Sequence, residues 1–271
     1  MKEESTMNAN PLSMPLRSVK PRQEGLTVVI DNGIPVGVFE DAIASAAYGI
    51  DLVKFGWGTA LVTPRLEEKM ACLRQHGIGY FFGGTLFEKF VTQDLVEDYF
   101  EFCQRYGCGY VEVSDGTIHL SAARKAQLIA RAAQEFIVLS EVGYKDAERS
   151  AALTGDQWVS FIEQDFAAGA TLVVTEARES GRSGICDPSG QPRFDVIEQI
   201  IDSGADCGRL VFEAPTKELQ AFFVTRLGSD VNLANVAPGD VIALETLRLG
   251  LRSDTLVHFE LERRQERSIH A

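Results

Sequence analysis

Two opposite charges follow an apolar run in the segment SEVGYKD, residues 140–146. The run at 136–139 is typical of a buried strand, and Glu141 and Lys145 come directly after it. A lysine beside a carboxylate can act as general acid or base, and we expect desolvation to lower the pKa of such a lysine. The same two residues could equally form a structural ion pair of small energetic value. The residues that end the other apolar runs help to decide between a catalytic lysine and a structural ion pair.

Polar residues close every one of eight apolar runs in the chain. They are Asp31, Lys54, Thr85, Glu112 with Ser114 and Asp115, Glu141 with Lys145, Glu176 with Arg178 and Glu179, Glu213, and Asn232 with Asn235. One such residue is usually a helix cap, and Asp31, Thr85 and Asn235 can be caps or turn formers. Eight polar strand ends in succession favour an active site.

The elements that position these residues alternate regularly along the chain. The apolar runs lie at 26–31, 52–56, 80–84, 110–114, 136–140, 171–175, 209–213 and 230–234. Helical segments separate them, and Thr154 with Gln157 forms a capping-box pattern. Eight strand-helix units predict a single-domain (β/α)8 TIM barrel over residues 25–252, whose strands end at one shared mouth. An open doubly wound sheet is the alternative, but no GxGxxG follows the first strand.

The remaining segments and the composition narrow the class of protein. Residues 1–24 are predicted to be a flexible arm and 253–271 a charged tail; the arm has no apolar stretch long enough for a signal or membrane span. The formal charge of -13 argues against nucleic acid as a partner. Five cysteines without a CxxC pair argue against a disulfide framework or zinc knuckle. We expect a cytoplasmic homo-oligomer that acts on small molecules.

Clustered carboxylates without histidine favour a hard cation. No histidine closes a strand, so zinc is disfavoured, whereas Mg²⁺ prefers oxygen ligands and keeps waters for a substrate. We expect two or three carboxylates of the barrel mouth to hold Mg²⁺ directly or through water, from the set Glu112, Asp115, Glu176 and Glu213. Glu176 and Glu213 could instead orient Lys145 and the arginines.

A loop rich in arginine and glycine follows the sixth run. Arg178 and Arg182 can grip phosphate or carboxylate in bidentate fashion, and Gly181 and Gly184 allow close backbone approach. A flexible surface loop is the competing reading. Two further polar residues are expected to help bind an anionic substrate: Lys54 and Asn232.

Several of these segments together resemble one enzyme family. The chain carries LTVVIDNG, DLVKFGWGT, FGGTLFE, VEVSDG, SEVGYKD, EARESG, VFEAP, VNLANV and LETLRLGLRSDT in order over about residues 24–256. In type and spacing they are similar to the phosphosulfolactate synthase family. That resemblance implies Mg²⁺-dependent addition of sulfite to phosphoenolpyruvate, giving (2R)-phospho-3-sulfolactate for coenzyme M or sulfolactate. It implies a metal-stabilised aci-carboxylate that Lys145 protonates at C2, with Glu141 tuning the lysine or binding the metal.

One departure from the family pattern lies in the central segment. Archaeal members often carry two adjacent lysines there, whereas this chain has Tyr144 and Lys145. The retained lysine aligns with the second of the pair, which the resemblance makes the catalytic one. Two alternatives stay open: another Mg²⁺-dependent lyase or aldolase acting on a phosphorylated or carboxylated small molecule, and a catalytically silent, stress-associated relative. The strand-end charges are all present, which favours an enzyme.

Overall fold

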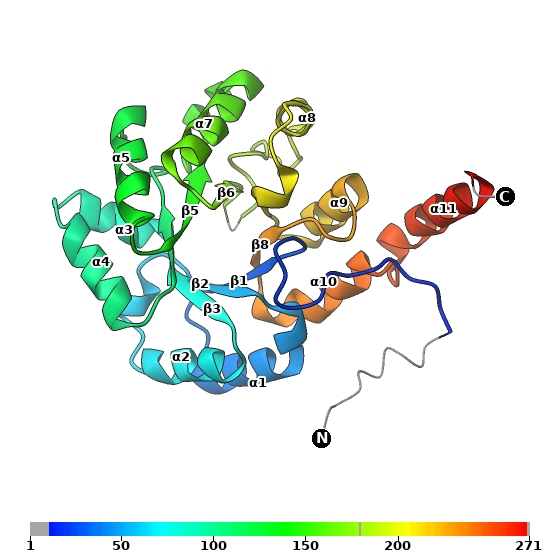
Figure 1. The fold of residues 1–271 in the computed structure, drawn as a ribbon, viewed down its shortest axis with the longest axis horizontal. Helices are drawn as coiled ribbons and strands as arrows, with labels where there is room; N and C mark the ends of the chain where they lie inside the picture. The colour runs from blue at the N-terminus through cyan, green and yellow to red at the C-terminus, as the bar shows by residue number, and fades with distance from the viewer. Residues whose placement is uncertain (1–10, 179, 270–271) are drawn as a thin grey trace.

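The computed structural model describes residues 11–178 and 180–269. Its centre is a sheet of eight parallel strands ringed by helices (Figure 1). The strands are β1 Thr27–Asp31, β2 Leu52–Phe55, β3 Gly79–Phe82, β4 Tyr110–Val113, β5 Ile137–Val142, β6 Leu172–Thr175, β7 Leu210–Glu213 and β8 Leu233–Val236. Each lies at or next to an apolar run of the sequence, so the expected strand count is confirmed.

The strands follow one another around a nearly closed barrel. Their order is β3-β2-β1-β8-β7-β6-β5-β4, and β3 and β4, the two ends of this order, lie in contact. Parallel pairing of consecutive strands requires a crossover after each one, which the helices provide. The predicted (β/α)8 barrel is confirmed, and the open doubly wound sheet is excluded.

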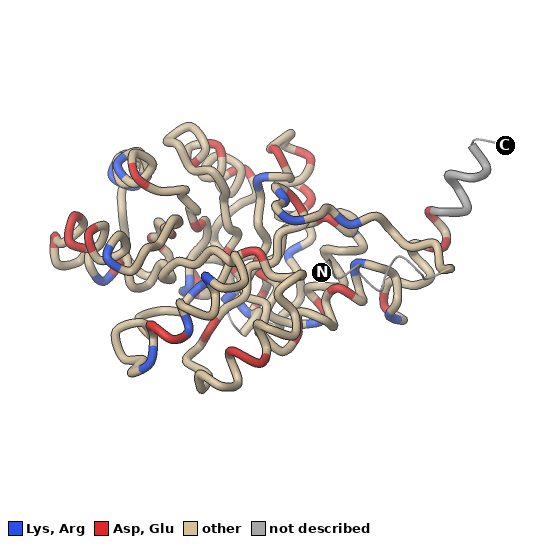
Figure 2. Tube along the Cα trace, turned by 60° about the horizontal axis from the view of Figure 1, so that its bottom comes forward, with Lys and Arg blue, Asp and Glu red and all other residues tan. Residues whose placement is uncertain are grey.

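Helices follow the strands along the chain, and most of them cover the outside of the barrel. They are α1 Val36–Ala46, α2 Leu66–Gln75, α3 Gly84–Val91, α4 Val96–Arg105, α5 Ala122–Ala132, α6 Ala147–Ala152, α7 Gly155–Ala168, α8 Phe194–Asp202, α9 Lys217–Leu227, α10 Val241–Arg248 and α11 Ser253–Ile269. The predicted capping box at the start of α7 is confirmed, because Thr154 and Gln157 satisfy each other's backbone N–H groups. Figure 2 shows acidic residues interspersed with basic ones along these helices.

Two apolar layers hold the barrel together. The larger layer lies between the strands and the helices, and it includes Phe39, Trp158 and Phe223, each fully buried. The smaller layer fills the barrel interior, with Phe81, Leu139 and other side chains that face inward. The polar strand ends therefore stand above a solid apolar floor.

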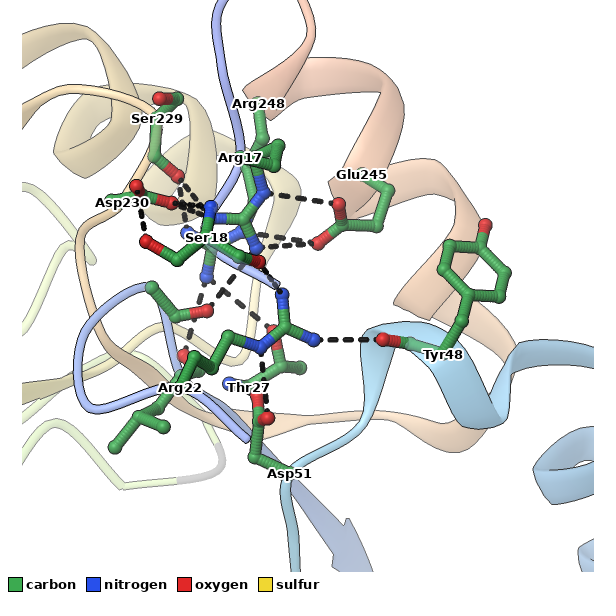
Figure 3. Close-up of polar contacts among 12 residues, drawn as sticks. Arg17, Ser18, Arg22, Thr27, Tyr48, Asp51, Ser229, Asp230, Glu245 and Arg248 are labelled. Carbon is green, nitrogen blue, oxygen red and sulfur yellow. Dashed lines mark hydrogen bonds and ion pairs between the residues drawn. The ribbon is translucent and has the colours of Figure 1, made fainter. Parts of the chain in front are cut away.

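The arm before the barrel is anchored where the structure describes it. Arg17 contacts the carboxylates of Asp230 and Glu245, and Arg22 Nε lies 2.8 Å from Asp51 Oδ1 (Figure 3). Nη1 of the fully buried Arg248 donates to Val231 O at 2.7 Å beside this cluster. The flexible arm expected over residues 1–24 is thus held to the barrel at Arg17 and Arg22 by ion pairs with barrel carboxylates. Residues 1–10 of that arm lie outside the described residues.

The segment expected to be a charged tail forms a helix. α11 extends away from the barrel (Figure 1). Its first turn is fixed to the barrel, since the buried Thr255 hydroxyl donates to Leu247 O at 2.7 Å. No helix among the described residues has the length and apolar character needed to cross a membrane.

Candidate active site

Strand alternation turns charged side chains into the barrel mouth. Side chains two residues apart in a strand share one face of the sheet. The residue two places before each charge lies in the interior apolar cluster: Leu52 before Lys54, Leu139 before Glu141, Val174 before Glu176 and Val211 before Glu213. The four charged side chains therefore point inward at the carboxyl ends of their strands, above the apolar floor.

Three carboxylates surround the ammonium group of Lys54. Its Nζ lies 2.9 Å from Glu112 Oε1, 3.3 Å from Glu213 Oε1 and 3.6 Å from Glu141 Oε2. Backbone N–H groups bind the other oxygens: Gly84 donates to Glu112, and Ala177 donates to Glu213 at 2.9 Å. The lysine is thus fixed by contacts from β4, β5 and β7.

Lys145 stands on the outer side of the same carboxylate cluster. Its Nζ lies 2.7 Å from Glu141 Oε1 and 3.1 Å from Glu176 Oε2, both 1% exposed, while its own side chain is 22% exposed. The backbone turns at Gly143, whose φ of 117° and close approach to Trp158 leave no room for a side chain. The sharp turn predicted at Gly143 is confirmed, and it brings Lys145 back over Glu141.

The two lysines keep their protons more firmly than burial alone would allow. Burial lowers the pKa of Lys145, but Glu141 and Glu176 raise it more, so the net pKa lies above its usual value. The pKa of Lys54 is also raised, because Glu112, Glu213 and Glu141 outweigh burial. The expected lowering by desolvation is wrong, since the carboxylates dominate. Lys145 is a charged proton donor in this arrangement.

The glutamates divide into ionised and proton-holding groups. Burial would raise the pKa of Glu141, but Lys145 and Lys54 lower it well below its usual range. Burial raises the pKa of Glu112 to about 7, with Lys54 opposing and Glu141 adding to the rise. Burial, followed by Glu213 and Glu141, raises the pKa of Glu176 well above its ordinary value. Glu112 and Glu176 thus hold a proton more firmly than an ordinary carboxyl group, whereas Glu141 stays ionised between the two lysines.

A narrow cavity of about 20 Å³ opens among these groups. It is lined by Ile30, Lys54, Trp57, Gly84, Thr85, Glu141, Lys145, Glu176, Arg178, Glu213 and Asn235. Arg178 and Asn235 have left-handed backbone conformations, with φ of 55° and 57°. Asparagine tolerates this conformation better than most residues. Residues of seven strand ends and their loops thus converge on one small space at the mouth.

The arginine and glycine loop lies only partly at this cavity. Arg178 lines it and donates from Nη1 to Lys145 O at 3.3 Å, whereas Arg182 is exposed and is not among the lining residues. Gly181 and Gly184 both have positive φ, and a Cβ on Gly184 would fall 1.6 Å from Glu176 O. Gly184 is needed so that the loop can pack on the end of β6.

The structure corrects the expected place of two site residues. Asn232 precedes β8 at the opposite end of the barrel, where its side chain accepts from Leu26 N and donates to Gly208 O and Leu210 O at 2.8 to 2.9 Å. Asp115 turns outward to Lys125, with Nζ to Oδ1 at 3.3 Å. Neither side chain lines the mouth cavity, because backbone groups hold Asn232 and Lys125 holds Asp115.

The strand-end residues that could have been caps separate into different roles. Asp31 accepts from Gly33 N and Ile34 N and pairs with buried Lys69 at 2.5 Å, so it shapes the turn after β1. Thr85 and Asn235 line the cavity instead. Sequence reasoning also missed Glu88, a buried carboxylate that binds Ser114 at 2.6 Å. Its place on a helix, outside any strand end, gave no signal.

The mouth can supply oxygen ligands to a Mg²⁺ ion, but few from the protein alone. Within residues 11–178 and 180–269, no three His, Cys, Asp and Glu side chains are placed to hold a metal by themselves. Buried Glu176 Oε2 and Asn235 Oδ1 accept no hydrogen bond from the described residues. Mg²⁺ commonly uses one or two protein oxygens and takes the rest from water and substrate. These two buried oxygens fit that pattern.

A larger cavity of about 790 Å³ lies at the opposite end of the barrel. Its lining includes Leu26, Leu52 and Leu172 near the starts of strands, and residues 20–23 of the arm. None of the charged strand-end residues reaches it. Since barrel enzymes act at the carboxyl ends of their strands, the small polar mouth is the candidate active site.

Known proteins resemble the chain over most of its length. Residues 15–254 match the family model of (2R)-phospho-3-sulfolactate synthase. The chain belongs to the phosphosulfolactate synthase family. The phosphosulfolactate synthase of Bacillus subtilis is 52% identical over 249 residues, which cover 92% of this chain and 99% of the relative. The phosphosulfolactate synthase of Methanothermobacter thermautotrophicus is 41% identical over 92% of this chain and 98% of its own.

Solved structures outside the phosphosulfolactate synthase family share the fold. A 3-hexulose-6-phosphate synthase matches 83% of this chain and 99% of its own, with a TM-score of 0.51 and 15% identity. The carboxyl transferase domain of Rhizobium etli pyruvate carboxylase matches 79% of this chain and 40% of its own, with a TM-score of 0.54 and 12% identity. At such identities the likeness concerns the barrel alone. Assignment to a family of enzymes therefore rests on the sequence relatives.

Proposed function

We propose that this chain adds sulfite to phosphoenolpyruvate and forms (2R)-phospho-3-sulfolactate. The sulfur lone pair of sulfite forms a bond to the methylene carbon, and the double-bond electrons move through C2 into the carboxylate. The resulting aci-carboxylate then takes one proton at C2, and the phosphate ester stays intact. The observation that supports this best is a charged lysine, Lys145, held at the mouth by Glu141 and Glu176 in a member of this family.

Lys145 suits the proton-donating step. Its raised pKa keeps it protonated until a strongly basic carbon appears, and its ammonium is the more exposed of the two mouth lysines. Glu141 holds that ammonium and would stabilise its charge again after the proton is replaced. Lys54 is buried among three carboxylates and suits a fixed positive charge rather than a mobile proton.

Two anions must meet in this site, so local positive charge is required. Lys54 and Arg178 line the cavity and can face the carboxylate and phosphate of phosphoenolpyruvate, with Arg182 and the backbone at Gly181 and Gly184 in the adjoining loop. A space of about 20 Å³ is far smaller than this substrate. Binding therefore requires the lining side chains to move apart, and Arg178 and Trp57 are exposed lining residues that can do so.

We also propose Mg²⁺ as the cofactor, held by Glu176 and Asn235 with help from Glu112 or Glu213. When bound, the ion supplies positive charge that offsets the negative charge growing on the substrate carboxylate. The chain's own contribution is to hold buried oxygens at the mouth and to keep the lysines charged beside them. The outward pairing of Asp115 with Lys125 favours the other carboxylates as ligands.

The deciding experiment is incubation of the purified chain with phosphoenolpyruvate and sulfite, with and without Mg²⁺, followed by mass detection of phosphosulfolactate. We expect product that depends on all three additions and is lost in Lys145→Met. Consumption of phosphoenolpyruvate with another nucleophile, but not with sulfite, would instead indicate a different lyase. No consumption with any nucleophile would favour a non-enzymatic role.

We also propose that the enzyme works in the cytoplasm. The five cysteines are free in the described structure, as a reducing cytoplasm would keep them. Assembly into a homo-oligomer stays a prediction.

A further inference from the structure

One buried carboxylate close to the mouth takes no part in the proposed reaction. Glu88 on α3 is 2% exposed and does not line the cavity. Its Oε1 lies 2.6 Å from Ser114 Oγ, and its Oε2 accepts from Thr117 N at 3.1 Å and Ile118 N at 3.2 Å. All three partners belong to the segment that follows β4. Glu88 therefore fixes residues 114–118 through three hydrogen bonds.

That segment forms a wall against Lys145. Gly116 O accepts from Lys145 N at 3.0 Å, and a Cβ on Gly116 would lie 3.0 Å from Lys145 Nζ and 3.2 Å from Glu141 Oε1. Ser114 Oγ also lies 2.8 Å from Glu141 Oε1, the oxygen that contacts Lys145. The place of the Lys145 ammonium thus depends on where residues 114–116 lie.

We propose that Glu88 is a positioning residue for Lys145, acting through Ser114 and the backbone of residues 116–118. The inference rests on the proposed role of Lys145 as proton donor. In this chain of contacts Glu88 holds Ser114 and the loop, Ser114 contacts Glu141, and Glu141 and Gly116 hold Lys145. Misplacement of a catalytic group by about 1 Å can lower turnover by about 100-fold.

Two substitutions of Glu88 separate the effect of its hydrogen bonds from the effect of its charge. A hydroxyl has one hydrogen, so Ser114 donates to Glu88 or to Glu141 at one time. In Glu88→Gln, the amide oxygen can accept from Thr117 N and Ile118 N, and the amide nitrogen can donate to Ser114 Oγ. The hydrogen of Ser114 then goes to Glu141, and the wall stays in place. Glu88→Ala loses all three hydrogen bonds.

The first test compares kcat and KM in the variants by phosphosulfolactate formation. We expect Glu88→Ala to lower kcat by about 10- to 100-fold with little change in KM for phosphoenolpyruvate, and Glu88→Gln to stay within about threefold of the parent enzyme. Gly116→Ala provides a second variant in case Glu88→Ala does not fold, because its Cβ presses on the Lys145 ammonium from the same side. Glu101→Ala, an exposed change on α4, is the control.

The second test needs no activity. Acetic anhydride labels free lysines, and peptide mass spectrometry gives the rate at each one. We expect Lys145 to be labelled several-fold faster in Glu88→Ala, at the parent rate in Glu88→Gln, and buried Lys69 to stay protected in both. General loosening of the fold would expose Lys69 as well and would overturn the proposal.

The two tests also separate this inference from the proposed function. If the parent chain forms no phosphosulfolactate, the proposed function fails, while the labelling of Lys145 still tests whether Glu88 positions it. Loss of turnover in Glu88→Gln equal to that in Glu88→Ala would show that the charge matters rather than the geometry, and the positioning role would be wrong. Parent-like kcat and labelling in Glu88→Ala would also overturn it.

Discussion

Lys54 and Lys145 bind opposite oxygens of one carboxylate, that of Glu141. Lys145 Nζ lies 2.7 Å from Oε1 and Lys54 Nζ lies 3.6 Å from Oε2. The ionised glutamate thus separates a buried lysine that is fixed by other carboxylates from a more exposed lysine at the opening. A change at either lysine alters the charge that the other one feels, so single variants must be read with this link in mind.

Replacing Lys145 by methionine tests the proton donor directly. Methionine keeps the length and apolar stem of lysine but carries no proton to give. We expect Lys145→Met to bind phosphoenolpyruvate and remain folded, while turnover falls by about 10²- to 10⁴-fold, the usual contribution of general acid catalysis. Rates of phosphosulfolactate formation, with binding by calorimetry and folding by circular dichroism, give the three readouts.

The exposed Lys217 on α9 offers a matched control. Lys217→Met removes the same charge at a residue that does not line the cavity, and it should leave turnover unchanged. If turnover in Lys145→Met stays within a few-fold of the parent, the Lys145–Glu141 contact is a structural ion pair. Lys54 then becomes the candidate proton donor.

The two arginines of the loop after β6 should differ in their effect on substrate binding. Arg178 lines the cavity and reaches Lys145 O, whereas Arg182 is exposed outside the lining. We expect Arg178→Ala to weaken phosphoenolpyruvate binding by about 2 kcal/mol or more, because a substrate charge loses its partner in the complex. Arg182→Ala should change affinity by less than about 1 kcal/mol. Equal affinities in the two variants, measured by calorimetry, would contradict this assignment.

The fold could be predicted because its signals are local. Each strand is a short apolar run and each crossover has helix signals, such as the capping box of Thr154 and Gln157, so counting the units was enough. The anchoring of the arm was not predictable. Arg17 meets Asp230 and Glu245, more than 200 positions away, and no local pattern encodes such a pairing.

The site was predictable only as far as strand direction determines it. Lys54, Glu141 and Glu213 reach the mouth because they occupy inward positions at strand ends. Asp115 lies just past the end of β4 but turns outward to Lys125. Asn232 precedes β8, because that strand runs over Leu233–Val236 and not over the expected 230–234, and its side chain binds backbone groups at the opposite end of the barrel. The direction of the Lys145 pKa shift depends on Glu141 and Glu176, which come from the ends of two different strands. The sequence alone does not show how close these carboxylates lie to the lysine.

Glu176 gives the sharpest test of a metal site. Its Oε2 is buried, accepts no hydrogen bond from the described residues and lies 3.1 Å from Lys145 Nζ. We expect Glu176→Gln to raise the Mg²⁺ concentration needed for half-maximal activity by about 10- to 100-fold, as loss of one metal contact or its support does. Asp115→Asn is the matched control, since Asp115 faces Lys125 and should leave the Mg²⁺ titration unchanged. Overlapping Mg²⁺ titrations for parent and Glu176→Gln would remove Glu176 from the metal site.

The carboxyl group of Glu112 should make the fold less stable as pH rises. Burial raises its pKa in the folded chain to about 7, above the ordinary 4.5. A carboxyl with a raised pKa binds its proton more tightly in the folded state. Its contribution to stability is therefore fully present below about pH 4.5 and is lost as pH rises through about 7.

Glu112→Gln removes this titration while its amide oxygen can still accept from Gly84 N. Without added Mg²⁺, we expect the free energy of unfolding to fall between pH 5 and pH 8 by about 1 to 3 kcal/mol more in the parent than in Glu112→Gln. Urea unfolding at the two pH values measures both differences, and Glu101→Gln on the exposed face of α4 should behave like the parent. Equal losses of stability in parent and Glu112→Gln would mean that Glu112 stays ionised beside Lys54 throughout this range.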